Sequence, residues 1–238
     1  MPPADGAVLE ARGLVKRFAA SPVLRGLDLS ITPGRILLIL GENGSGKTTL
    51  LRILAGLTRP TSGELFLEGR AFRSSDVASR RSIGFLSHRS HMYDEMSLRE
   101  NLHFAARLYG LGKGEAAVGW AIELARLEEK ADQRVGRLSR GMQQRAALAR
   151  AFLHQSRILL LDEPFTALDV PSADRVRQWI GERAGEGCAI VVVTHQPEGI
   201  WDLASDVGVL AAGRWAILEG RPSDAAGFQA RYRDAIRV

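Results

Sequence analysis

The sequence predicts an α/β fold in which the strands of a largely parallel sheet alternate with helices. Three apolar runs, 36–40, 158–161 and 189–193, lack the polar alternation of a half-exposed strand, which is typical of parallel strands buried on both faces. A glycine-rich stretch joins the first run to a helical segment. Between the first and second runs, a long region changes to helical spacing. These observations predict an α/β core that is interrupted by a helical insertion.

The first third of the chain contains short predicted strands separated by turn residues. Strands are expected over 8–15 and 24–31, ahead of the apolar run 36–40, and proline and glycine residues mark the turns between them. The helix after the glycine-rich stretch is expected to stop near Gly56. A further short strand is expected over 64–67.

The middle of the chain is predicted to be helical. After a core strand at 83–86, Ser97 and Glu100 form the S-x-x-E pattern of a capping box, and apolar residues then recur at helical spacing. Helices are expected over 98–109, 115–127 and 141–153. We therefore expect a helical lobe over about 88–155, inserted into a core made of 1–87 and 156–238.

The last third returns to alternating strands and helices. After the strand 158–161, the pattern predicts a helix over 172–184 and the strand 189–193. Strands over 207–210 and 215–218 and a final helix over about 222–236 complete the chain. The sequence has no internal repeat, so we expect one domain spanning 1–238.

Composition limits the classes of protein. With 238 residues and 45% hydrophobic residues, the chain can bury the core of one α/β domain with an attached lobe. The net charge of +5 comes without a basic low-complexity tail, so a directly bound nucleic acid is not expected. The single cysteine, Cys188, cannot form an intramolecular disulfide, which fits a reducing compartment. The N-terminus lacks the pattern of a signal peptide and no apolar run approaches the ~20 residues that span a bilayer. Any membrane role is therefore expected to act through another chain.

The glycine-rich stretch 41–48, GENGSGKT, matches the phosphate-loop pattern with a strand before it and a helix after it. Its glycines allow consecutive N–H groups to point at phosphate oxygens, and the helix N-terminus adds the positive end of its dipole. Lys47 would neutralise the β- and γ-phosphates, and Thr48 would ligate Mg²⁺. The sequence thus predicts a nucleoside triphosphate bound by Gly41, Glu42, Asn43, Gly44, Ser45, Gly46, Lys47, Thr48 and Thr49.

Two adjacent carboxylates follow the buried strand 158–161. Ligands of open α/β sheets bind at this end of a strand. Asp162 would hold Mg²⁺ directly or through water, and Glu163 would polarise the attacking water as general base. Two ionised carboxylates side by side make physical sense next to a cation.

The order of the motifs resembles that of ATP-binding cassette (ABC) ATPases. The stretch LSRGMQ, 138–143, is similar to the signature loop of that family, although Arg140 and Met142 depart from its commonest form, L-S-G-G-Q. The resemblance implies a P-loop NTPase (RecA-like) core with a small antiparallel β subdomain and an inserted helical subdomain. It also implies that Ser139 and Gly141 contact the γ-phosphate of ATP held by a second copy, so that the chain acts as a homodimer.

Further motifs extend the resemblance across residues 18 to 195. The stretch TALD, 166–169, resembles the D-loop, which implies that Asp169 contributes to the nucleotide site. His195 ends an apolar strand and resembles the switch histidine, a γ-phosphate sensor that keeps Glu163 and water aligned. Phe18 occupies the place of an aromatic residue that stacks on adenine.

One position departs from the family pattern. The family normally has a glutamine after the strand near residue 86, and here that position is His88. A neutral imidazole nitrogen can accept from metal-bound water or approach Mg²⁺, so we predict that His88 serves both catalysis and the metal. We also expect the ATPase rate to fall below about pH 6.5 partly through this residue.

His88, the run 93–102 and the signature stretch together resemble the haem exporter ATPase of cytochrome c maturation. The resemblance implies ATP hydrolysis with Mg²⁺ and an integral membrane permease as partner, docked near 88–110. It further implies a peripheral position at the cytoplasmic face of the inner membrane, with haem export or delivery as the driven process. Two alternatives stay open: an ABC exporter of drugs, lipids or polysaccharide, and a soluble ABC ATPase, of which iron–sulfur assembly fits better than translation or DNA repair. A kinase-like phosphate-loop enzyme would not explain the signature loop and His195.

Overall fold

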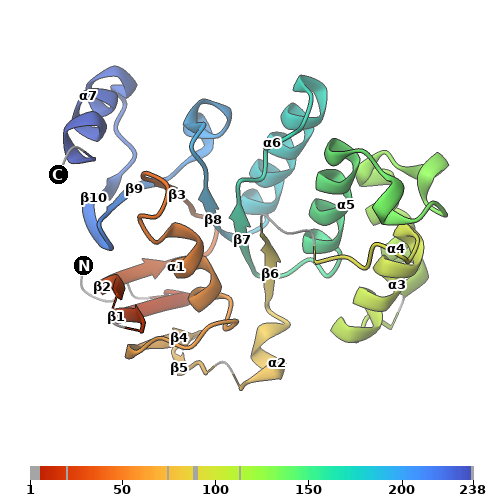
Figure 1. Cartoon of the computed structure of the whole chain (residues 1–238), viewed down its shortest axis with the longest axis horizontal. Helices are drawn as coiled ribbons and strands as arrows, with labels where there is room; N and C mark the ends of the chain where they lie inside the picture. Colours follow the sequence, from red (N-terminus) through yellow and green to blue (C-terminus); the bar gives the residue numbers. More distant parts are fainter. Residues whose placement is uncertain (1–5, 20, 74, 88–90, 113, 237–238) are drawn as a thin grey trace.

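The computed structural model describes residues 6–19, 21–73, 75–87, 91–112 and 114–236 (Figure 1). Its core is a six-stranded sheet with the strand order β10-β9-β3-β8-β7-β6. The five strands from β9 to β6 are parallel, and β10 pairs with β9 in the antiparallel direction. The strands are β3 (Ile36–Leu40), β6 (Ile83–Leu86), β7 (Ile158–Asp162), β8 (Ala189–Val193), β9 (Asp206–Ala211) and β10 (Arg214–Gly220).

The sheet is buried on both faces, as the apolar runs predict. All five residues of β3 are buried, and they alternate between two hydrophobic clusters. Leu37 and Ile39 join the cluster on one face, whereas Leu38 and Leu40 join the cluster on the other. Because helices cover both faces of this sheet, its strands have no solvent-facing side on which polar residues could lie.

A second sheet is small and antiparallel, with the order β2-β1-β4-β5. It consists of β1 (Leu9–Phe18), β2 (Ser21–Ile31), β4 (Ser62–Leu67) and β5 (Arg70–Ala71). The first two strands extend beyond the predicted 8–15 and 24–31 because they form a hairpin in which Phe18 pairs with Ser21. Helix α1 (Lys47–Leu54) packs between the two sheets, and its buried leucines belong to the cluster that both sheets share (Figure 1).

Three helices form a group beside the sheet. Helices α3 (Leu98–Tyr109), α4 (Gly114–Ala125) and α5 (Arg140–Phe152) bury a hydrophobic cluster of their own (Figure 1). The predicted capping box begins α3: the Ser97 hydroxyl accepts from Glu100 N at 3.1 Å and the Glu100 carboxylate accepts from Ser97 N at 2.7 Å. Because these helices bury a cluster of their own, we propose that they form a helical lobe over about 88–155.

Helix α5 also connects this group to the core, because Phe152 belongs to the hydrophobic cluster that lies between the six-stranded sheet and helix α6 (Val170–Gly185). The remaining helices are α2 (Val77–Arg80) and α7 (Ala225–Ala235), with single 3₁₀ turns at Glu128–Lys130, Val135–Arg137, Pro197–Gly199 and Trp201–Leu203. Helix α7 begins later than the predicted residue 222 because Asp224 caps it, accepting from Gly227 N at 2.9 Å. Within the described residues, no helix is long and apolar enough to cross a bilayer.

Candidate active site

The phosphate loop connects the end of β3 to α1, as predicted. Gly41 has a φ of 149°, and a side chain there would collide with the carbonyl oxygen of Leu210 on β9. Gly46 is the N-cap residue of α1, so the loop ends directly at a helix N-terminus. The loop backbone is thus packed against the sheet, with the dipole of α1 behind it.

Two polar side chains of the phosphate loop, Lys47 and Ser45, lie buried within it. The Lys47 ammonium donates to the carbonyl oxygens of Gly41 and Glu42, both at 2.7 Å, and burial lowers the pKa of this amine. The buried hydroxyl of Ser45 has no hydrogen-bond partner among the described residues. A cation and a buried hydroxyl in a loop of backbone N–H groups fit an anionic ligand such as a triphosphate.

Thr48 and Asp162 lie together at the carboxyl edge of the sheet. The Thr48 hydroxyl donates to Oδ2 of Asp162 at 2.8 Å, and Asp162 is buried at the end of β7. Within the described part of the chain, no group of three or more His, Cys, Asp or Glu side chains forms a cage for a metal ion. One hydroxyl and one carboxylate fit Mg²⁺, which commonly takes few protein ligands and completes its shell with phosphate and water.

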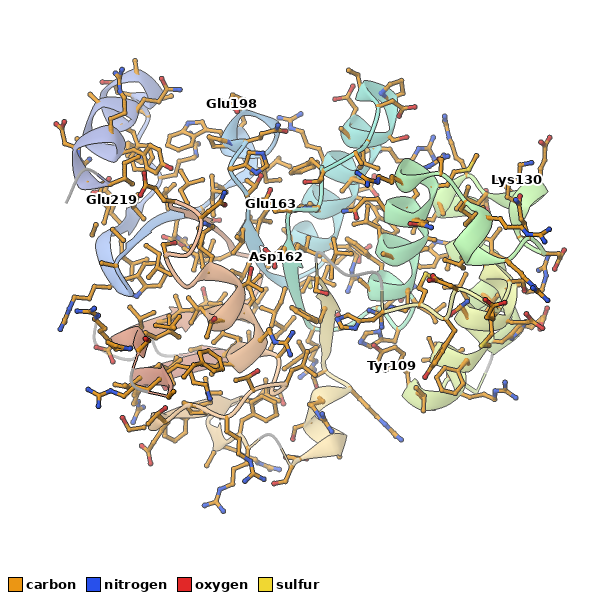
Figure 2. The ribbon with its side chains drawn as sticks, in the orientation of Figure 1. Tyr109, Lys130, Asp162, Glu163, Glu198 and Glu219 are labelled. Carbon is orange, nitrogen blue, oxygen red and sulfur yellow. The ribbon has the colours of Figure 1, made fainter. Side chains whose placement is uncertain are left out.

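Glu163 follows Asp162 and is fixed by the loop after β8. Its backbone is left-handed, with a φ of 52°. Its Oε1 lies 2.9 Å from Nδ1 of His195, and its Oε2 accepts from the Thr194 hydroxyl at 3.0 Å. Figure 2 shows Asp162 and Glu163 side by side at the centre of the molecule, at the end of β7. The structure therefore brings together the predicted phosphate loop, both carboxylates and His195.

Sequence reasoning missed two residues of this arrangement. Thr194 is buried and its hydroxyl donates to the Glu163 carboxylate, but the sequence marks it only as the residue before His195. Gln144 on α5 donates to the carbonyl oxygens of Glu163 at 3.1 Å and Pro164 at 3.3 Å. The only sequence signal for Gln144 is its place directly after the signature stretch, because a glutamine side chain does not reveal its acceptors.

The signature residues occupy the start of α5. Ser139 is the N-cap residue, and its hydroxyl accepts from Met142 N at 3.3 Å. A side chain at Gly141 would lie 2.8 Å from the carbonyl oxygen of Ala167, so the D-loop backbone requires a glycine there. Among the described residues, no hydrogen bond or ion pair joins Ser139 to the phosphate loop.

Asp169 and Phe18, two further predicted site residues, lie at the start of α6 and at the end of β1. Asp169 caps α6 by accepting from Ser172 N at 2.9 Å, and hydrogen bonds from the Ser172 side chain and backbone lower the pKa of its carboxyl. Phe18 ends β1 and is 52% exposed, and the Lys16 ammonium lies 4.8 Å from the centroid of its ring. His88 lies outside the described residues, beyond the end of β6.

Comparison with known proteins identifies the family. The family model described as ABC transporter matches residues 24–166. Over 206 residues, the chain is 40% identical to the cytochrome c biogenesis ATP-binding export protein CcmA 2 of Cupriavidus metallidurans, covering 85% of this chain and 98% of that protein. It is 39% identical to a sulfate/thiosulfate import ATP-binding protein of Methylococcus capsulatus, covering 87% of this chain and 61% of that protein. It is also 36% identical to a Nod factor export ATP-binding protein I of Cupriavidus metallidurans, over 92% of this chain and 72% of that protein.

Solved structures share the fold. An ATP-binding subunit of an ABC transporter superposes with a TM-score of 0.88 at 24% identity, covering 96% of this chain and 99% of that one. A dimeric ATP-binding cassette in a post-hydrolysis state, bound to ADP and Pi, superposes with a TM-score of 0.83 at 25% identity, covering 90% and 99%. With a phosphate loop, paired carboxylates and a histidine at one edge of the sheet, the chain belongs to the ABC transporter family as an ATP-binding subunit that couples ATP hydrolysis to transport.

Proposed function

We propose that this ATPase drives haem export or delivery in cytochrome c biogenesis through an integral membrane permease. The observation that carries its catalytic role is the Glu163 carboxylate, which is held between His195 and Thr194 beside the phosphate loop. The cargo proposal is supported by 40% identity to two cytochrome c biogenesis ATP-binding export proteins from Cupriavidus species. We place the chain at the cytoplasmic face of the inner membrane as a peripheral subunit.

In the proposed reaction, the loop backbone and Lys47 bind the β- and γ-phosphates. Thr48 and Asp162 would hold Mg²⁺, which supplies positive charge to these phosphates when bound. Glu163 orients a water for attack on the γ-phosphorus and accepts its proton, while the bond from this phosphorus to the β–γ bridging oxygen breaks and ADP leaves. His195 contacts one carboxylate oxygen of Glu163, and we propose that its exposed side chain senses the γ-phosphate. The contact of His88 with Mg²⁺ stays a prediction.

The complete site is proposed to require two copies of the chain. Ser139 and Gly141 begin α5, whereas the phosphate loop begins α1, and no hydrogen bond between described residues links Ser139 to that loop. Two solved structures similar to this chain, at 25% and 26% identity, are dimeric cassettes. We propose that ATP lies between the phosphate loop of one copy and Ser139, Gly141 and Asp169 of the other, with Phe18 stacked on adenine.

A surface groove is the proposed docking site of the permease. It has a volume of about 460 Å³ and lies between the core and the helical group. We define the docking groove by Leu57, Arg81, Phe85, Phe104, Leu108 and Arg150. Leu57 is 45% exposed and Leu108 is 61% exposed, and both line the same groove, where apolar side chains gathered on one surface favour an interaction site.

The alternatives differ in the partner and the cargo. The sulfate/thiosulfate import and Nod factor export relatives keep another transported substrate open. A soluble ATPase of iron–sulfur cluster assembly would use the same groove for a soluble scaffold. The identity of the protein bound at the groove therefore separates these functions.

The experiment removes the gene from its native organism and measures covalently bound haem in c-type cytochromes. The proposal expects loss of this haem, recovery with the wild-type gene, and no recovery with Glu163→Gln expressed at the same level. A parallel purification from native membranes should recover a multispan membrane protein. Normal cytochromes in the deletion strain, or a soluble scaffold as the bound protein, would contradict the proposal.

A further inference from the structure

The net positive charge of the chain lies in its first third. Residues 1–81 contain 12 lysines and arginines against 7 aspartates and glutamates, whereas residues 82–238 contain 20 of each kind. The net charge of +5 therefore belongs to the segment that forms the small antiparallel sheet, β3, α1 and α2. Charge gathered in one part of a chain favours a binding partner of the opposite sign at that part.

Several arginines of this segment have no carboxylate partner. Arg52, Arg73 and Arg81 are exposed, and none of them forms an ion pair with another described residue. The acidic side chain nearest to them in the sequence is that of Asp76, which caps α2 by accepting from Ser79 N at 3.0 Å. Its charge also faces the following Arg80, which we therefore leave out of the unpaired set.

The turn after α1 brings two basic segments together. The N–H groups of Leu57 and Thr58 both donate to the carbonyl oxygen of Arg52, at 2.9 and 3.1 Å, so the chain folds back at the end of the helix. A side chain on Gly56 in this turn would lie 2.7 Å from the ring of Phe72, which shows how closely the turn packs against the chain ahead of α2. Figure 1 shows α2 and the β4–β5 hairpin together at the lower edge of the view, below α1. We define the basic surface by Arg52, Leu57, Arg59, Arg73 and Arg81.

An apolar side chain projects from the basic surface. Leu57 is 45% exposed, and the exposed Arg52 and Arg59 precede and follow it. This combination is typical of a segment at lipid headgroups, where the apolar side chain reaches the acyl boundary and the long basic side chains stay with the phosphates. A nucleic acid would engage the arginines through its phosphates but would leave the leucine uncovered. The basic surface therefore fits an anionic bilayer better than a nucleic acid.

The position of the basic surface agrees with a bilayer partner. Leu57 and Arg81 also line the docking groove, so the two surfaces are continuous. A permease seated in the groove is embedded in the membrane, and the surface beside it then faces the same membrane. The cytoplasmic leaflet carries anionic lipids, and its potential attracts basic side chains within about 8–10 Å at physiological salt.

We infer that the basic surface contacts anionic lipid headgroups directly, with the guanidinium groups of Arg52, Arg59 and Arg73 at the phosphates and Leu57 at the boundary of the acyl chains. This inference rests on the proposed docking of a membrane subunit. Guanidinium groups bind phosphate oxygens through paired hydrogen bonds. Because the permease already holds the chain at the membrane, a weak lipid contact acts there at high effective concentration. The contact would fix how the small sheet and α1 face the bilayer.

Vesicle flotation tests the lipid contact without the permease. The full chain is mixed with vesicles of phosphatidylcholine alone or with about 30% phosphatidylglycerol. The inference expects binding to the anionic vesicles that is at least about tenfold tighter, and loss of most of it when salt rises from about 0.1 M to about 0.5 M. Equal binding to the two compositions would overturn the inference. It would leave the proposed docking and cargo intact, because the assay contains neither permease nor haem.

A triple variant locates the contact on the chain. Arg52→Gln, Arg59→Gln and Arg73→Gln are combined, and this variant should bind the anionic vesicles at least about tenfold more weakly than the wild type. Its ATPase rate should remain that of the wild type, since none of the three residues belongs to the nucleotide site. Vesicle binding within about twofold of the wild type would overturn the inference.

A matched control separates local charge from net charge. Arg137→Gln, Arg214→Gln and Arg233→Gln remove the same charge from exposed positions elsewhere on the chain. This control should change vesicle binding less than about twofold. An equal loss in the control and in the variant of the basic surface would show that net charge alone binds the vesicles, and would overturn the inference.

Two competitors identify the source of the phosphate. Glycerol phosphate at constant ionic strength should leave the chain on the vesicles, because one soluble phosphate does not reproduce a charged surface. Single-stranded RNA should bind more weakly than the anionic vesicles. Displacement by glycerol phosphate, or tighter binding to RNA that is lost in the triple variant of the basic surface, would overturn the inference.

The last test uses the assembled complex and does not depend on the folding of a triple variant. A photo-reactive amino acid replaces Arg73 in the full chain, and native membranes are illuminated and analysed by mass spectrometry. The inference expects an adduct with an anionic phospholipid. Adducts with protein alone would overturn it.

Discussion

Oε1 of Glu163 lies 2.9 Å from Nδ1 of His195, and strand register produces this contact. Strands β7 and β8 are adjacent and parallel, with Asp162 opposite Val193. The residues that follow these two positions, Glu163 and Thr194, therefore leave the sheet side by side. Because both strands are buried, the relative position of carboxylate and histidine is set by the core of the protein.

Glu163→Gln should abolish turnover and preserve ATP binding. The amide keeps the size of the side chain but cannot accept a proton from water, so kcat should fall by about 10²- to 10⁴-fold. ATP affinity should remain close to that of the wild type. A phosphate-release assay and equilibrium ATP binding check the two parts, with the exposed Glu198→Gln as matched control. A Glu163→Gln protein that hydrolyses ATP at the wild-type rate would refute the assigned base.

Thr194→Val should lower kcat with little change in KM. Valine fills the same buried volume but removes the hydroxyl that donates to the Glu163 carboxylate at 3.0 Å. A hydrogen bond to a charged group contributes about 1.5–3 kcal/mol, so we expect about a 10- to 100-fold loss of kcat. Thr194→Ser retains the hydroxyl and should keep most of the activity. Equal losses in the valine and serine variants would show that the hydroxyl does not position Glu163.

Gln144→Leu should loosen the catalytic loop. This change removes the donors to the carbonyl oxygens of Glu163 and Pro164, which tie α5 to the segment after β7. We expect faster amide hydrogen exchange over 163–168 and a kcat several-fold below that of the wild type. Gln143→Leu is the matched control, since Gln143 donates to the carbonyl oxygen of Val135 within the helical group. The idea fails if both variants exchange alike in this loop.

His154 should make the protein less stable in mild acid. Its ring stacks on Tyr109 with centroids 3.7 Å apart, and burial, followed by the nearby charges of Arg150 and Arg183, lowers its pKa from 6.5 to about 4. The unfolded chain therefore binds a proton below pH 6.5 that the folded chain resists. Stability should fall as the pH drops from 6.5 towards 4, by about 3 kcal/mol from this group, and be independent of it above 6.5.

Urea denaturation between pH 4 and 8 measures this effect. His154→Phe keeps an aromatic ring against Tyr109 and removes the titrating group, so its unfolding free energy should vary less over this range. The same pH dependence in the phenylalanine variant and the wild type would show that other groups dominate.

The sequence predicted those features that depend on local pattern. The unbroken apolar run 36–40 indicated a strand buried on both faces, and the following glycines and lysine indicated the phosphate loop, because each is defined by neighbouring residues. Contacts across the sheet could not be read in this way. Thr194 and Gln144 act on Glu163 through strand register and helix packing, which bring residues 31 and 19 positions apart together.

Element ends were missed for a similar reason. The predicted ends of β1 and β2 stopped short of the hairpin in which Phe18 pairs with Ser21, and α7 starts where Asp224 can cap it. The short helix α2 carries too few residues to show periodicity. For Asp169, the family pattern predicts a contribution to the nucleotide site. In the single chain its carboxylate instead caps α6, a role that depends on where the helix begins.

The central claim is that one ATP site is built from two copies, and mixed dimers test it most directly. Lys47→Met disables the phosphate loop of one copy. Ser139→Asp places a negative charge against the γ-phosphate in the other copy while keeping a residue that can cap α5. Each variant alone should be inactive, but a mixture should form heterodimers in which an intact Lys47 faces an intact Ser139. An ATPase rate well above the sum of the separate variants is the predicted result, and a mixture no more active than that sum would contradict the composite site.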